Sequence, residues 1–213
     1  PIYIIFKRKK SYYTFSDFFI QSKEEVFPEG ITIKYQFLHN KWKKRFVGLG
    51  WQKRIKKQGG RWNDYSKRVR RDVAYLGIGR IVPPTENSAS RNYKGVFTPI
   101  GEQGWERSVA EIVGSIIDKD YSSFYYQNHS KYYLPVVSAG ETTYSGFNMG
   151  AGENALFEMF SVILSLPAGF LLLVDEIELG LHEKAQRKLI EQLKIICEKT
   201  HMQVICTTHS STI

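Results

Sequence analysis

The sequence Phe-Leu-Leu-Leu-Val-Asp-Glu occupies residues 170–176 and joins an uninterrupted apolar run to two acids. Such a run is typical of a strand that is covered on both faces of a sheet. A second run, Gln-Val-Ile-Cys-Thr-Thr, occupies residues 203–208 and is followed by His209. Because ligands bind beyond the carboxyl ends of the strands in open α/β sheets, we expect Asp175, Glu176 and His209 to share one edge.

The segment between the two runs, residues 183–199, carries apolar side chains at intervals of three and four residues. This spacing predicts one amphipathic helix. A strand, a helix and a second strand form a βαβ unit, in which the strands are parallel and the crossover is almost always right-handed. The predicted fold class is therefore α/β, with a parallel core sheet flanked by helices and a β-rich antiparallel lobe contributed by the first third of the chain.

Several motifs in the last third of the chain resemble those of ABC-type ATPase heads. Residues 172–176 resemble a Walker B motif, residues 178–182 a D-loop, and residues 207–210 a switch-histidine segment. Residues 149–154, Met-Gly-Ala-Gly-Glu-Asn, occupy the place of the signature motif, and a helix is expected over residues 155–166. The order and spacing of the motifs over about 65 residues make the resemblance specific.

The chain is most similar to the C-terminal portion of heads in the branch that contains SMC-like repair ATPases, OLD-family nucleases and the AAA-type ATPase subunits of bacterial antiphage systems. The resemblance implies ATP and Mg²⁺ as cofactors. It implies that Asp175 holds a water of Mg²⁺, that Glu176 orients the attacking water, and that His209 senses the γ-phosphate. The residues that it places against nucleotide or at the seam between two heads are Gly150, Gly152, Glu153, Asn154 and His182.

The sequence departs from this family at two points. Gly150 stands where many members have a serine, so backbone donors or Asn148 would have to contact the phosphate. No glycine in the chain is followed by lysine, so the sequence lacks the loop G-x-x-x-x-G-K-[ST] that holds phosphates. We expect that loop to lie upstream of Pro1; a degenerate head is the alternative.

The length of 213 residues is enough to bury a core. We expect a β-rich part over residues 1–80, with strands over residues 2–6 and 30–37, the second ended by Asn40, and with a basic insertion over residues 41–71. We expect a helix and a hairpin over residues 81–147, with residues 142–147 as the returning arm of the hairpin, and the motif region over residues 148–213. The two cysteines, Cys197 and Cys206, form no disulfide framework, which favours a reducing cytoplasm.

One long apolar stretch, residues 155–174, approaches the length of a membrane span. Glu158 interrupts it, and Pro167 and Gly169 punctuate it. We therefore expect a buried helix followed by a buried strand, and no contact with a membrane.

Residues 41–71 are strongly basic: thirteen cations accompany a single acid, Asp64, whereas the net charge of the whole chain is only +9. Trp42, Trp51 and Trp62 are interleaved with the cations. This mixture can bind phosphates and stack on bases, which makes DNA or RNA one candidate partner. A solvated insertion and a surface for an acidic protein are the alternatives.

Together these features predict an ATP-binding and ATP-hydrolysing subunit whose heads form a homodimer, or a higher oligomer, on ATP. Its expected task is to control a nuclease or another effector protein, with antiphage defence as the expected setting. One alternative is a nucleic-acid-binding scaffold with a degenerate ATPase head. Another is the ATPase part of an OLD-type nuclease.

Overall fold

The computed structural model describes residues 22–25, 30–43, 46–56, 72–82, 96–129 and 132–213. Two compact units make up the chain: residues 7–71 form one, and residues 1–6 with 72–213 form the other. The predicted strand at residues 2–6 lies outside the described residues.

The smaller unit contains a hairpin of two antiparallel strands, β1 (Thr32–Lys43) and β2 (Phe46–Ile55). One expectation for this part is corrected. The first strand runs on past Asn40, where it was expected to end, because β2 pairs with it as far as Lys43. Strand β2 lies within the basic stretch and supplies one arm of the hairpin, and whether the stretch is an insertion stays a prediction.

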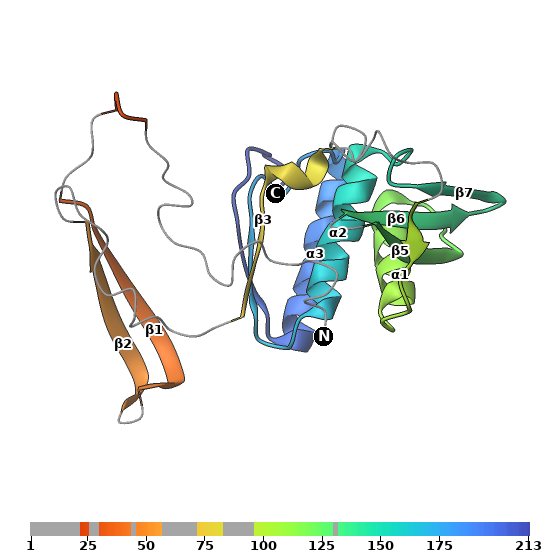
Figure 1. Ribbon diagram of the computed structural model, residues 1–213. Helices are drawn as coiled ribbons and strands as arrows, with labels where there is room; N and C mark the ends of the chain where they lie inside the picture. The colour runs from red at the N-terminus through yellow and green to blue at the C-terminus, as the bar shows by residue number, and fades with distance from the viewer. Residues whose placement is uncertain (1–21, 26–29, 44–45, 57–71, 83–95, 130–131) are drawn as a thin grey trace. The chain divides into compact units, whose positions relative to one another are not determined.

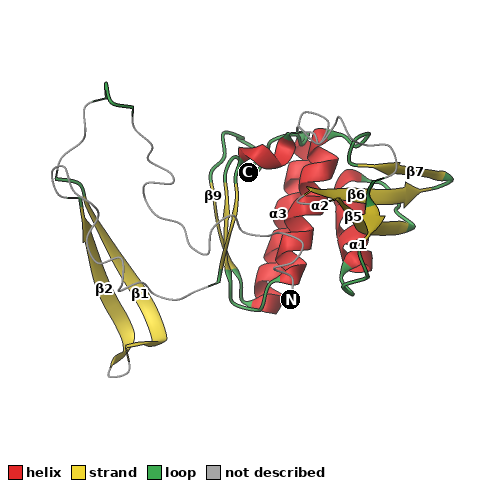
Figure 2. Cartoon of the chain, in the orientation of Figure 1, coloured by secondary structure: helices red, strands yellow, loops and turns green. Residues whose placement is uncertain are grey.

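The larger unit contains the predicted parallel sheet. Its strands β3 (Val73–Leu76), β8 (Leu171–Val174) and β9 (Gln203–Cys206) lie in the order β3-β8-β9, and both pairs are parallel. Helix α3 (Glu183–Thr200) connects β8 to β9, which confirms the βαβ unit expected from the spacing of apolar residues. Figure 2 shows α3 beside these strands.

Helix α2 (Ala151–Ser165) lies on the same side of the parallel sheet as α3 (Figure 1). It starts four residues before its expected start, directly at the glycine-rich turn. Most of its residues are buried, which fits a helix that is apolar on nearly every side, and Phe157 and Phe160 are completely enclosed. In the part of the chain that the structure describes, no helix has the length and apolar character needed to cross a membrane.

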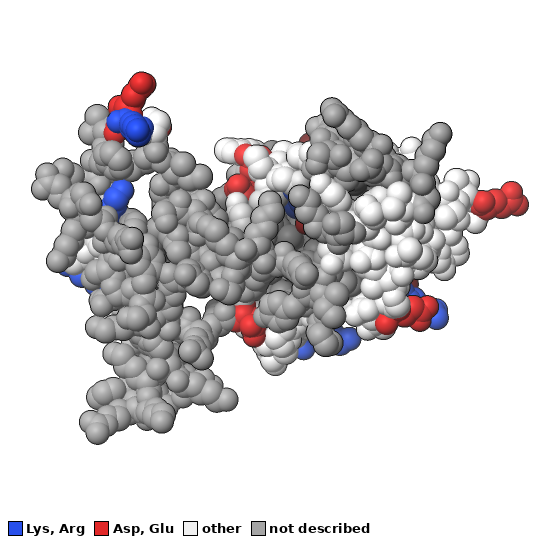
Figure 3. Space-filling view, in the orientation of Figure 1, with Lys and Arg blue, Asp and Glu red and all other residues white. Residues whose placement is uncertain are grey.

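Helix α1 (Glu106–Ile117) packs against α2 and against a four-stranded antiparallel sheet in the order β4-β5-β6-β7. Figure 3 shows few charged side chains on the visible surface over this sheet. The hairpin expected at residues 142–147 is present, as β7 pairs with β6. The strands are β4 (Thr98–Pro99), β5 (Ser123–His129), β6 (Tyr132–Ala139) and β7 (Thr142–Ser145).

A single hydrophobic core unites these layers, with contributions from both sheets and all three helices. Leu172 of β8 and Val137 of β6 are fully buried members of it. Since β3, β8 and β9 all run in the same direction, their carboxyl ends meet at one edge, where the motif residues follow.

Candidate functional site

The residues that follow β8 and β9 are joined through one threonine. The parallel register pairs Val174 with Cys206, so the next residues along each strand lie opposite each other. Thr207 Oγ1 donates a hydrogen bond to Asp175 Oδ1 over 2.7 Å and accepts one from the backbone amide of Glu176 over 2.8 Å. The two adjacent acids are therefore held at the sheet edge by the hydroxyl of the neighbouring strand.

His209 lies beside Glu176 at this edge. Its Nε2 is 3.8 Å from Glu176 Oε1, and the side chains of His209 and Glu176 are 86% and 35% exposed, so both are open to a ligand. The backbone amide of His209 donates to Glu178 Oε1 over 2.6 Å. Burial acts to raise the pKa of Glu178, but hydrogen bonds from the His209 amide, its own amide and the Thr208 hydroxyl outweigh this and lower the pKa.

A further contact ties the histidine segment to α3. Ser210 Oγ donates to Gln186 Oε1 over 2.6 Å, and Gln186 Nε2 donates to Leu181 O over 2.8 Å. Gln186 is buried, so this bridge fixes the segment after β9 and the turn before α3 to the same side chain.

Arg80 reaches the same edge from the segment after β3, although we assigned it no role from the sequence. It lies in the 3-10 helix η4 (Ile78–Ile81), directly after β3, and only 4% of its surface is exposed. Its Nη1 donates to Asp175 O over 2.7 Å and its Nη2 to Glu176 O over 2.6 Å. Burial lowers the pKa of the guanidinium, and the charges of Glu158, Asp175, Glu178 and Glu176 act against that. The sequence signal for Arg80 is a cation directly after a buried strand.

The glycine-rich turn before α2 lies against the turn after β8. Gly150 is the exposed N-cap of α2, whereas Gly152 is buried. A Cβ on Gly152 would lie 2.1 Å from the carbonyl oxygen of Gly180, so only glycine fits there. Gly180 itself has a φ of +78°. Packing within the chain thus explains the glycine at position 152, and its contact with nucleotide stays a prediction.

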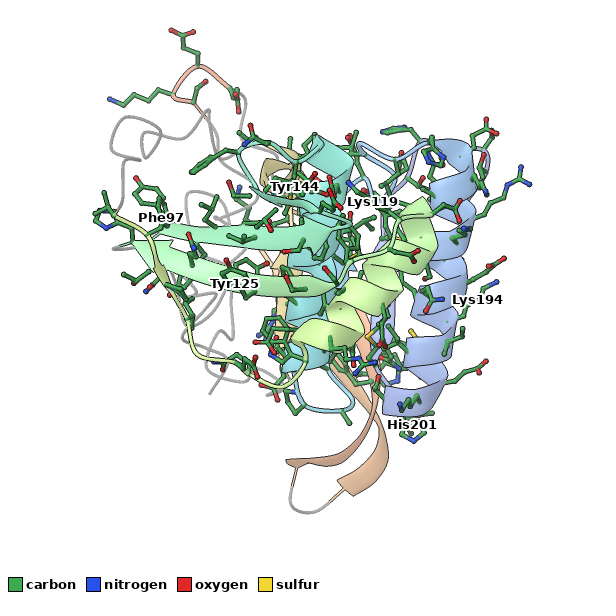
Figure 4. All side chains as sticks on the ribbon, turned by 90° about the vertical axis from the view of Figure 1, so that its right-hand side faces the viewer. Phe97, Lys119, Tyr125, Tyr144, Lys194 and His201 are labelled. Atoms are coloured by element: carbon green, nitrogen blue, oxygen red, sulfur yellow. The ribbon has the colours of Figure 1, made fainter. Side chains whose placement is uncertain are left out.

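Of three other predicted binding residues, Glu153 and His182 have hydrogen-bond partners within the chain, and Asn154 is buried. Glu153 Oε1 accepts hydrogen bonds from the hydroxyls of Tyr121 and Tyr144 and lies 3.3 Å from Lys119 Nζ; Figure 4 shows Lys119 and Tyr144 together. His182 is the N-cap of α3, and its Nδ1 accepts from the Ala185 amide over 3.3 Å. Asn154 is 8% exposed, and its Oδ1 has no hydrogen-bond partner in the described part of the chain. Any contact of these residues with nucleotide stays a prediction.

The oxygen atoms at the sheet edge fit a nucleotide-bound Mg²⁺. Mg²⁺ in such sites is held by one or two carboxylates, with phosphate and water supplying the other ligands. Asp175 supplies one carboxylate, and Thr207 orients it. Among the residues that the structure describes, no three His, Cys, Asp or Glu side chains gather as a metal cluster. That Asp175 holds the ion stays a prediction.

Comparisons with known proteins give one family match and a solved structure of low similarity. A chain from a solved structure described as "Structural biochemistry of ATP-driven dimerization and DNA stimulated activation of SMC ATPases" aligns with 50% of this chain and 68% of its own length, at 18% identity and a TM-score of 0.37. No curated protein matches the chain. The family described as "AAA domain, putative AbiEii toxin, Type IV TA system" matches residues 6–213. The chain, with its acid pair, threonine and histidine at the end of a parallel sheet, therefore belongs to this family of AAA-type ATPase domains.

Proposed function

We propose that this chain is part of an ATP-hydrolysing switch whose heads dimerise on ATP and thereby control an effector protein. The observation that carries the proposal is the hydroxyl of Thr207, which joins the Asp175 carboxylate to the Glu176 amide. The two acids lie with His209 at the carboxyl ends of adjacent parallel strands, where nucleotides bind in open α/β sheets.

Each residue at the edge has a distinct chemical role in this proposal. Asp175 holds the water shell of Mg²⁺. The Glu176 carboxylate orients the attacking water and accepts its proton, the role of a general base. His209, exposed and 3.8 Å from Glu176, donates a hydrogen bond to the γ-phosphate. Bound ATP supplies the phosphoanhydride bond and the charge that brings two heads together.

The test is ATP turnover by the natural full-length protein and its Glu176→Gln variant. Glutamine keeps the shape of the side chain and removes the base, so turnover should fall by about 10²- to 10⁴-fold while nucleotide still binds. Because the γ-phosphate then persists, the ATP-bound dimer should accumulate. Glu141→Gln, at an exposed turn between β6 and β7, is the matched control. Parental turnover by Glu176→Gln would refute the assignment.

The family description supports the wider setting. It names a toxin and a toxin–antitoxin system, and on that basis we extend the proposal to a role in antiphage defence. The expected effector is a nuclease that responds to closure of the heads.

A second candidate function, nucleic-acid binding, is favoured by one face of the β1–β2 hairpin. In its register Lys34 lies opposite Lys53, and Gln36 lies opposite Trp51, which is 62% exposed. Like charges directly across two strands repel each other, and an anion between them would relieve the repulsion. An exposed tryptophan next to such an anion site offers a stacking surface for a base. Arg54 does not belong to this face, because it is only 5% exposed.

The salt dependence of binding to single-stranded DNA and RNA tests whether the hairpin binds nucleic acid. Lys34→Glu with Lys53→Glu should weaken binding and lower the salt slope by about one unit for each lost phosphate contact. Lys194→Glu, on the exposed side of α3, is the matched control. An unchanged slope would leave the basic stretch as a solvated surface or as a docking surface for an acidic protein.

A further inference from the structure

The backbone of Glu176 has an unusual conformation. Its φ is +48°, in the left-handed region that a residue with a side chain adopts only at an energetic cost. Within the described residues, two other non-glycine residues have positive φ, Asp118 and His201, and both are C-caps of helices. Glu176 ends no helix, so other contacts must hold it in this conformation.

Both polar groups of the Glu176 backbone are occupied. Its amide donates to Thr207 Oγ1 over 2.8 Å. Its carbonyl accepts from Arg80 Nη2 over 2.6 Å and from the Leu179 amide over 3.0 Å. The preceding carbonyl, that of Asp175, accepts from Arg80 Nη1 over 2.7 Å. The successive carbonyls of Asp175 and Glu176 therefore both accept hydrogen bonds from the guanidinium group of Arg80.

An arginine is suited to this task, and a lysine is not. The guanidinium group is a rigid planar fork whose donors can serve two acceptors at fixed positions. Arg80 is itself anchored, because Nη1 also donates to Gly77 O over 3.0 Å and the side chain is almost completely enclosed. The charge of the Glu158 carboxyl on α2 also acts to raise the pKa of Arg80. A lysine here would offer one compact charge without the fork.

We propose that Arg80 is a positioning residue for hydrolysis: it fixes the left-handed turn at Glu176 and thereby aims the Glu176 carboxylate at the attacking water. This inference rests on the proposed ATPase function. The inference assigns Arg80 no contact with nucleotide. The hydrogen bonds described above are donated by Arg80 to main-chain carbonyls of its own chain. Loss of the fork should therefore impair the chemical step and spare nucleotide binding.

The first test compares kcat with the affinity for Mg-ATP in the natural full-length protein. Arg80→Lys keeps the charge and removes the fork, so kcat should fall by about 10- to 100-fold, because small misplacements of a catalytic group are costly. The dissociation constant of a fluorescent ATP analogue should change by less than about threefold. Arg107→Lys, whose side chain is 92% exposed in an ion pair with Glu111, is the matched control and should behave as the parent.

Two outcomes of this comparison would overturn the inference: a parental kcat, or losses of kcat and of affinity by the same factor. Circular dichroism measures the folded fraction of each variant. A fall in kcat that merely follows the folded fraction counts against the inference as well.

The second test measures how well the turn at Glu176 is protected from hydrogen exchange, and it needs no activity measurement. Amide hydrogen exchange over residues 175–181 should be faster in Arg80→Lys, because the carbonyl that accepts from the Leu179 amide is no longer fixed. Exchange in α1 should be unchanged. Equal exchange over residues 175–181 in variant and parent would overturn the inference. If Glu176→Gln is inactive while Arg80→Lys is fully active, only the inference about Arg80 fails; if Glu176→Gln is fully active, the proposed function fails.

Discussion

Thr207 Oγ1 lies 2.7 Å from Asp175 Oδ1 and 2.8 Å from the backbone nitrogen of Glu176, so one hydroxyl organises both acids at the end of the neighbouring strand. In this arrangement the hydroxyl donates to the carboxylate and accepts from the amide, which uses both of its hydrogen-bonding functions. Thr207 therefore links the placement of the expected Mg²⁺ ligand to that of the expected base.

Replacing Thr207 with valine keeps the shape of the side chain and removes both hydrogen bonds. The free energy of unfolding should fall by about 0.5–1.5 kcal/mol for each. The Mg²⁺ concentration needed for half-maximal nucleotide binding should rise, because Asp175 loses its orienting donor. Thr207→Ser restores the hydroxyl and should behave as the parent in urea unfolding and in Mg²⁺ titrations. Equal behaviour of the valine and serine variants would contradict this role.

Replacing His209 with alanine should have a different effect from replacing Glu176. The histidine is proposed to contact the γ-phosphate, so His209→Ala should lower turnover and weaken the ATP-dependent dimer. Glu176→Gln should instead stop turnover and let the dimer accumulate. Light scattering with and without ATP measures the mass of each variant. His201→Asn is the control, since His201 is exposed and asparagine tolerates its left-handed conformation. If both site variants dimerise alike, His209 does not report on the γ-phosphate.

The sequence predicted the parallel sheet and its helix because these elements carry regular patterns. β8 has a continuous apolar run before two acids, and α3 repeats apolar residues such as Leu189 and Leu193 at helical spacing. Strand β5 was not predicted, because its tyrosines combine large apolar rings with polar hydroxyls and blur any alternation. The structure shows that Phe124 and Tyr126 of β5 are buried while Ser123 is exposed.

The contacts of the site were less predictable than its location. Asp175, Glu176 and His209 follow strands whose register fixes which residues meet. Arg80 contacts main-chain carbonyls, and a carbonyl is present at every position of a sequence, so its place after a buried strand marks the cation but does not reveal its partners. The contacts of Glu153 were hidden for a related reason: its partners Tyr121 and Tyr144 lie outside its own helix, so no helical spacing marks them.

Substitutions at the two signature glycines should differ sharply in their effect on stability. Gly152→Ala would place a methyl group 2.1 Å from the carbonyl oxygen of Gly180, and relief of that clash should cost about 1–3 kcal/mol or more. In Gly150→Ala the added methyl group has no atom within 4 Å. The free energy of unfolding should therefore fall only by the amount typical of a changed N-cap, about 1 kcal/mol or less. Urea unfolding of both variants checks the difference. Equal stabilities would show that Gly152 and Gly180 do not pack as described.

The carboxyl of Glu158 should make the stability of the chain depend on pH in the neutral range. Glu158 lies on α2, and burial raises its pKa from 4.5 to about 7, while the charge of Arg80 acts to lower it. Tyr126 also faces this carboxyl, and its own pKa is raised, chiefly by burial. Below about pH 4.5 the carboxyl is protonated in both the folded and the unfolded chain, so it contributes no pH dependence there.

Between these two pKa values the unfolded chain releases the proton while the folded chain keeps it. The free energy of unfolding should therefore fall as pH rises from 4.5 to about 7, by at most about 3 kcal/mol, and level off above that range. Glu158→Gln keeps the shape of the side chain and cannot ionise, so its stability should match that of the parent near pH 4.5 and exceed it at pH 8. Urea unfolding of both proteins from pH 4.5 to 8 provides the measurement. Parallel pH profiles for parent and variant would show that Glu158 does not titrate in this range.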